Sequence, residues 1–222
     1  MSFMDFAYGE KELSHLRSKD PKLGAAIDRI GHVSREVETD LFSSVIHHII
    51  GQQVSMAAQR TVWARFQSAV GPVITAEAVA EKTAEELQSL GMTFRKASYI
   101  LDFAEKVRSG EFHVAALAEM KDREVLEALS SLRGIGPWTA EMLMIFCMQR
   151  PDVVSYGDLA ILRGMRMLYQ KKTIDRKTFE RYRKRYSPYG TTASLYLWAI
   201  ACGGLPDLRD PAASNEKGRK KA

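Results

Sequence analysis

The fold of this chain is decided by the stretch Leu132-Arg133-Gly134-Ile135-Gly136-Pro137-Trp138-Thr139-Ala140, which lies between two helical patterns. Glycine has no Cβ atom, so Gly134 and Gly136 permit a tight turn and let another molecule approach the backbone closely. Pro137 suits the first position of a helix, where its missing N–H costs nothing. The N–H groups and the positive dipole end of that helix are suited to bind an anion. We interpret the stretch as a helix–hairpin–helix turn that binds phosphate; the alternative is an ordinary helix corner with a glycine cap.

The same turn also carries a candidate metal site. The backbone carbonyls of Ser130, Leu132 and Ile135 point away from the proposed phosphate, and carbonyl oxygens suit a monovalent cation. We expect any ion there to be Na⁺ or K⁺, bridging to the phosphate.

Asp158 is the candidate catalytic residue. Gly157 breaks the preceding segment, and an apolar stripe at helical spacing follows, so Asp158 should lie at a helix N-terminus, where the dipole keeps it ionised. A plain helix cap is a far commoner role for such an aspartate. The position of Asp158 downstream of the hairpin favours the catalytic interpretation.

The rest of the chain predicts an all-α fold. Apolar residues recur at helical spacing through most segments, and no run shows the alternation typical of a strand. Thr83 and Glu86 form a capping box at the start of a short helix. Helical spacing also covers 41–50 and 54–70, which Gly71-Pro72 ends, and the later predicted helices are 94–108, 122–131, 137–148, 159–169, 175–186 and 192–201.

These helices predict two lobes. Residues 36–148 form one compact run that contains the hairpin, and residues 1–35 must pack with 149–210 to bury their apolar faces. A cleft is expected between the lobes, where Trp138 and Asp158 meet. The last residues, 211–222, should be a disordered basic tail.

Composition excludes several classes of protein. The longest apolar run, 193–202, is too short to span a bilayer, and no secretory signal pattern opens the chain. The two cysteines, Cys147 and Cys202, are expected to be buried free thiols; they cannot supply an iron–sulfur cluster, and no Cys/His spacing fits zinc. Residues 171–222 hold 13 Lys/Arg against 5 Asp/Glu, a basic balance that could face a polyanion.

Aromatic rings and one polar turn complete the candidate site. Trp138, Tyr156 and Tyr189 flank the expected cleft, and aromatic faces can stack on an extruded base. Their alternatives are core packing for Trp138 and surface rings for the tyrosines; Trp198 we assign to the core. Gln53 lies at a break between two apolar helices, where its side chain could enter a duplex; the alternative is that the polar side chains here cap the loop.

Together these residues resemble the helix–hairpin–helix (HhH-GPD) DNA glycosylase superfamily, and within it the alkylbase, or 3-methyladenine DNA glycosylase II, branch. The resemblance spans residues 36–205 and is most specific at 51–55, 132–140, 156–158 and Pro188-Tyr189. It implies that Asp158 is catalytic and that Gln53, Gly134, Gly136 and Thr139 contact DNA. It also implies a base pocket lined by Trp138, Tyr156, Tyr189 and Met142.

The sequence departs from parts of the family pattern. Members that also cut the strand carry a lysine where this chain has Trp138, so a Schiff base is not expected. The larger alkylbase enzymes have a tyrosine at the position of Met142, and some relatives have tryptophan at that of Tyr189. These two changes leave the range of damaged bases open.

The resemblance implies a monofunctional enzyme of base excision repair. It would hydrolyse the N-glycosidic bond of alkylated purines in duplex DNA, as a monomer in the cytoplasm or nucleoid (the nucleus in a eukaryote), with no membrane partner and no required cofactor. Two alternatives remain open: a glycosylase of the same fold for other damaged or deaminated bases, and a DNA-binding protein that has lost catalysis.

Overall fold

A computed structural model describes residues 3–71 and 73–213, and helices dominate these ranges, as predicted. The chain divides into two compact units. The first comprises Phe3 and Glu38–Met148, and the second comprises Met4–Val37 and the described residues from Gln149 onward. None of the described helices is both long and apolar enough to cross a membrane.

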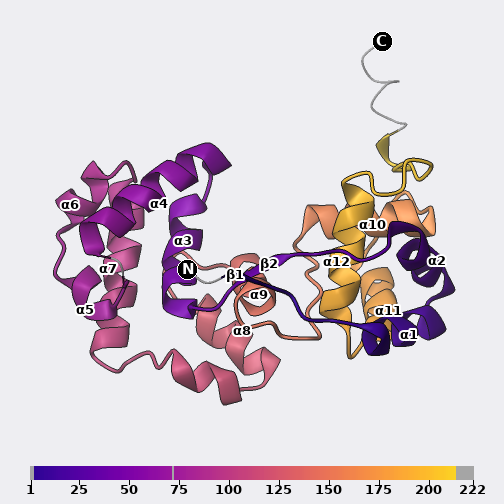
Figure 1. The fold of residues 1–222 in the computed structure, drawn as a ribbon, viewed down its shortest axis with the longest axis horizontal. Helices are drawn as coiled ribbons and strands as arrows, with labels where there is room; N and C mark the ends of the chain where they lie inside the picture. The colour runs from indigo at the N-terminus through magenta and orange to yellow at the C-terminus, as the bar shows by residue number, and fades with distance from the viewer. Residues whose placement is uncertain (1–2, 72, 214–222) are drawn as a thin grey trace, which may run out of the picture. The chain divides into compact units, whose positions relative to one another are not determined.

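The first unit is built around α3, which packs against α4, α7 and α9 (Figure 1). Its capping box at Thr83 and Glu86 is present as predicted. The short helices α5 and η1 were not predicted. Its elements are α3 (Leu41–Gly51), α4 (Met56–Val70), α5 (Ala76–Ala80), α6 (Ala84–Ser89), α7 (Phe94–Arg108), η1 (Ala115–Glu119), α8 (Asp122–Ser130) and α9 (Pro137–Phe146).

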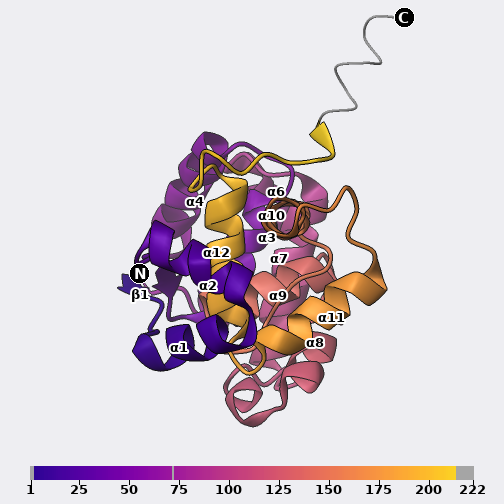
Figure 2. The same cartoon turned by 90° about the vertical axis from the view of Figure 1, so that its right-hand side faces the viewer.

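The second unit is built around α12, which packs against α10, α11, α1 and α2 (Figures 1 and 2). Helix α12 approaches α10 so closely that a Cβ atom on Gly164 would lie 2.2 Å from the carbonyl oxygen of Leu197. A glycine is therefore required at that crossing. The helices are α1 (Glu10–Lys19), α2 (Pro21–Ile30), α10 (Leu159–Tyr169), α11 (Arg176–Tyr186) and α12 (Gly190–Ala201).

Two short strands were not predicted. β1 (Phe3–Asp5) and β2 (Glu36–Glu38) pair in a two-stranded sheet. Three residues are too few for an alternating pattern to stand out from the sequence. Of the predicted tail, residues 211–213 form a turn against Asp210, and residues 214–222 lie outside the described part of the chain.

The two cysteines differ in accessibility. Cys147 is buried, and burial raises the pKa of its thiol to about 11. Cys202 is exposed, so the prediction that both thiols are buried was wrong for this residue. It follows the last residue of α12 and so lies beyond the apolar face of that helix.

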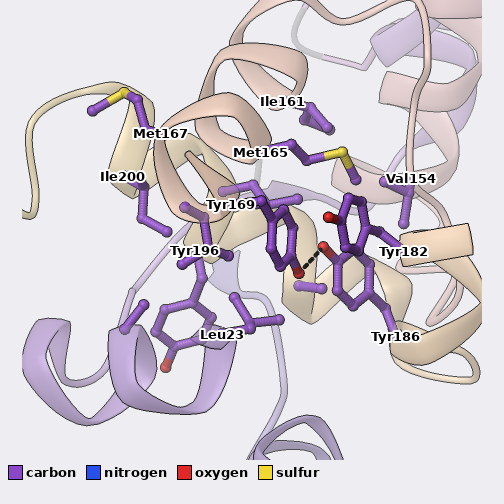
Figure 3. Close-up of a cluster of buried hydrophobic side chains, with 14 of the residues drawn as sticks. Leu23, Val154, Ile161, Met165, Met167, Tyr169, Tyr182, Tyr186, Tyr196 and Ile200 are labelled. Carbon is purple, nitrogen blue, oxygen red and sulfur yellow. Dashed lines mark hydrogen bonds between the residues drawn. The ribbon is translucent and has the colours of Figure 1, made fainter. Parts of the chain in front are cut away.

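One buried carboxylate, that of Asp20, accepts hydrogen bonds from three helices of the second unit. Asp20 is only 1% exposed and caps α2, accepting the backbone N–H of Leu23 at 3.1 Å. The Tyr169 hydroxyl donates to the same side chain at 2.7 Å, and Arg185 donates at 3.1 Å. Tyr169 also shares a 2.7 Å hydrogen bond with Tyr186 (Figure 3). Because burial raises the pKa of both tyrosines, their hydroxyls remain protonated donors.

We expect Tyr169→Phe to lower the free energy of unfolding by about 1–3 kcal/mol, because it removes a donor from the buried carboxylate of Asp20. The matched control is Tyr182→Phe: the Tyr182 ring stacks on that of Tyr169 at 3.7 Å, and its hydroxyl has no hydrogen-bond partner among the described residues. Urea unfolding of both variants measures the difference. Equal losses would show that the hydrogen bond from Tyr169 to Asp20 contributes no more than an unbonded hydroxyl at the same stack.

Candidate functional site

The hairpin turn takes its shape from one glycine. Helix α8 ends at Ser130 and α9 begins at Pro137, with Gly136 as the N-cap residue. Gly134 lies in the left-handed region at φ +86°, and a Cβ atom there would be 2.3 Å from the ring of Tyr99. Only glycine fits both constraints.

Gly136 has a different role in the turn. Its φ of −88° is open to any residue, and a Cβ atom built on it would have no atom within 4 Å. The first N–H groups of a helix have no partner inside the helix, so α9 begins with donors beside an open surface. This geometry suits an anion at the start of α9.

A cavity of about 680 Å³ opens beside the hairpin, entirely within the first unit. Gln53 is exposed in the turn between α3 and α4 at φ +56°, and Trp138 is 48% exposed at the start of α9. Of the predicted residues, the cavity wall includes Gln53, Gly134, Gly136, Trp138 and Thr139.

The cavity also contains residues that the sequence did not single out. Gln52, Lys96 and Tyr99 line it, and the Gln52 amide donates to the carbonyl of Gly134 at 2.6 Å. The guanidinium of Arg133 lies over the Tyr99 ring, 5.3 Å from the ring centroid, in a cation–π contact. Only Gln52, as part of the polar turn at 51–55, had any signal in the sequence.

Met142 does not line this cavity. It is buried in the interior of α9, with 5% of its surface exposed. A base-pocket role for Met142 remains a prediction from the resemblance alone.

The candidate cation site extends from the last residue of α8 into the hairpin turn. The carbonyl of Leu132 accepts the N–H of Ile135 at 3.0 Å. The hydroxyl oxygen of Ser130 is buried and has no hydrogen-bond partner among the described residues. Cation binding by these carbonyls stays a prediction.

Asp158 lies in the second unit as the N-cap residue of α10. It is 7% exposed, and its Oδ1 accepts the backbone N–H groups of Ala160 at 2.8 Å and Ile161 at 2.9 Å. Three N–H groups converge on this oxygen, because the Trp198 indole nitrogen also donates to it, at 3.2 Å. The carboxylate is therefore held in one orientation by charge-assisted hydrogen bonds.

Trp198 thus does more than fill the core. It lies half-buried on α12 and packs against the core of the second unit, as predicted, but its N–H reaches the candidate catalytic carboxylate. The sequence missed this contact because Asp158 and Trp198 lie on different helices.

The two tyrosines of the predicted pocket are half-buried and pack against the same core. Tyr156 has the guanidinium of Arg176 at 4.9 Å from its ring centroid and the Phe179 ring at 5.1 Å. Tyr189 is the N-cap residue of α12, and His15 meets its ring edge-to-face at 5.1 Å.

The chain is similar in sequence and in structure to known DNA repair proteins. The family model for HhH-GPD superfamily base excision DNA repair proteins matches residues 46–188. DNA-3-methyladenine glycosylase 1 of Schizosaccharomyces pombe is 29% identical over 191 residues, covering 83% of this chain and 84% of the relative.

Two solved structures share the fold along nearly the whole chain. DNA-3-methyladenine glycosidase from Bacillus halodurans gives a TM-score of 0.82 at 30% identity, covering 97% of this chain and 100% of the other. The S. pombe 3-methyladenine DNA glycosylase in complex with abasic DNA gives 0.75 at 26% identity, covering 90% and 99%. The chain belongs to the HhH-GPD superfamily of base excision DNA repair proteins.

Proposed function

We propose that this protein is a monofunctional DNA glycosylase that hydrolyses the N-glycosidic bond of alkylated purines, of the 3-methyladenine and 7-methylguanine type, in duplex DNA. The observation that carries the proposal is the carboxylate of Asp158, held at the start of α10 by three N–H donors in a chain that also has the hairpin. The proteins of similar sequence and structure that are named 3-methyladenine glycosylases support the substrate class.

Binding to DNA is assigned to the hairpin and the neighbouring turn. The N–H groups at the start of α9 would bind a backbone phosphate, with Gly136 allowing close approach. A monovalent cation on the carbonyls of Ser130, Leu132 and Ile135 would add to the attraction. Gln53 would fill the space left by the flipped nucleotide, and Trp138 would stack on the electron-poor base.

Asp158 would act on the sugar. A purine alkylated at N3 or N7 is already cationic, so it leaves with the electron pair of the C1′–N bond and needs no proton. The sugar then carries oxocarbenium charge, which an anionic carboxylate stabilises. Water adds to C1′ and loses a proton, and the products are a free base and an abasic site.

The backbone of the DNA should remain intact. Strand cleavage by this fold requires an amine that attacks the sugar, and Trp138 stands at the hairpin position that would supply it. Lys171 and Lys172 are exposed residues beyond the end of α10.

We propose that the enzyme works as a monomer, in the cytoplasm or nucleoid or, in a eukaryote, in the nucleus.

Asp158→Asn should nearly abolish base release, because the amide keeps the size of the side chain and loses the negative charge. Free base released from methylated duplex DNA measures the effect, and circular dichroism checks the fold. Full activity of the variant would remove Asp158 from the mechanism.

The DNA product of the wild-type enzyme should break only in hot alkali, and borohydride should trap no covalent protein–DNA adduct.

Trp198→Phe should slow base release about tenfold or more, with DNA affinity unchanged. Phenylalanine preserves most of the ring packing and lacks the N–H that orients Asp158; a hydrogen bond to a charged group is worth about 1.5–3 kcal/mol. Single-turnover kinetics on a methylated duplex separate this loss from binding. Activity equal to the wild type would mean that the indole N–H does not position the carboxylate.

The two hairpin glycines should respond differently to substitution. Gly136→Val should weaken binding to any duplex while leaving thermal stability nearly unchanged, because its side chain meets open space where the phosphate would lie. Gly134→Ala should lower thermal stability itself, since it combines a positive φ with a clash against Tyr99. Thermal melts and duplex titrations at fixed salt measure both. A Gly136→Val protein with full affinity would contradict the phosphate site.

A further inference from the structure

A run of hydrogen bonds in the first unit ties the hairpin to the turn between α3 and α4. The Gln52 side-chain amide donates to the carbonyl of Gly134 at 2.6 Å. The backbone carbonyl of Gln52 accepts from the Lys96 ammonium, also at 2.6 Å, and Lys96 donates to the carbonyl of Ile50 at 2.8 Å. Gln52 is therefore held through its side chain and through its backbone.

Lys96 fixes the end of α3. That helix ends at Gly51, and the carbonyls of a last helical turn lack partners within the helix. The Lys96 side chain is half-buried on α7, and burial, followed by the charge of Arg95, lowers the pKa of its ammonium. A charged donor partly withdrawn from water thus holds the carbonyls on either side of the α3 terminus in place.

On the hairpin side, one peptide group is bonded at both ends. Gln52 holds the oxygen of the Gly134–Ile135 peptide, and the N–H of the same peptide donates to Leu132 at 3.0 Å. A peptide group is planar, so these two bonds fix its orientation. The next peptide leads into Gly136, whose carbonyl accepts the N–H of Ala140 at 3.0 Å and starts α9.

We propose that Gln52 is a positioning residue for DNA binding: it locks the Gly134–Ile135 peptide and so aims the N–H groups at the start of α9. The lock joins those groups to Gln53, the next residue along the chain, which is exposed at φ +56°. The phosphate-binding turn and the side chain that enters the duplex are held in register before DNA arrives, which reduces the ordering cost of binding. The role in DNA binding rests on the proposed function; the lock itself rests on the geometry.

Gln52→Met is the direct test, because methionine keeps the length of the side chain and removes the donor without changing charge. Gln59→Met is the matched control. Gln59 lines the same cavity and is half-buried, but its amide donates to the backbone carbonyl of His47 at 3.2 Å instead of to the hairpin.

The rates of amide hydrogen exchange at Ile135 and Ala140 measure, in the absence of DNA, how firmly Gln52 holds the hairpin. We expect exchange at least about fivefold faster in Gln52→Met and within about twofold of the wild type in Gln59→Met. Affinity for an undamaged duplex at fixed salt should fall about five- to tenfold in Gln52→Met alone, as expected for the loss of one hydrogen bond.

The outcomes separate the lock from the proposed function. Exchange and affinity that are the same in the two variants overturn the proposal. Faster exchange in Gln52→Met with unchanged duplex affinity also overturns it, because the lock would then not serve binding. A wild-type chain that binds no duplex overturns the proposed function as well, and the exchange data would still show whether Gln52 holds the hairpin.

Discussion

The hairpin depends on the contact between Gly134 and Tyr99. A positive φ at Gly134 reverses the chain between α8 and α9, and the Tyr99 ring occupies the space where any side chain would stand. This single constraint sets the direction in which α9 begins. The phosphate site proposed at that end, the exposed ring of Trp138 and the carbonyl bonded by Gln52 all lie at this turn.

Aspartate side chains cap the N-termini of several helices in this structure. Asp20, Asp40, Asp158 and Asp175 each cap a helix with the side-chain carboxylate. Their surroundings differ: Asp20 is bonded to a tyrosine and an arginine in the core, whereas Asp158 takes the N–H of Trp198. The same local chemistry therefore serves stability in one place and, by our proposal, catalysis in another.

The sequence predicted the features that depend on local signals and missed the contacts between residues that are distant in the chain. Helical spacing predicted the all-α class, and α7 and α10 begin and end at the predicted residues, because their apolar stripes and caps are local signals. The pairs Trp198–Asp158 and Gln52–Gly134 join residues distant in the chain, and no local pattern marks them. The exposure of Cys202 and the two short strands were missed for related reasons: one depends on where α12 ends, and the others on a pairing between distant segments.

The discontinuity of the second unit has a consequence for biosynthesis. Apart from Phe3, the described residues of the first unit all lie between Glu38 and Met148, so this unit can be completed before the last helices of the second unit are synthesised. Helices α1 and α2 leave earlier, yet their partners α10, α11 and α12 come last. Their apolar faces, including Leu16, Leu23 and Ile27, have no complete core to pack in until those three helices have been synthesised. Until then, these faces are exposed apolar surface on the nascent chain and favour aggregation.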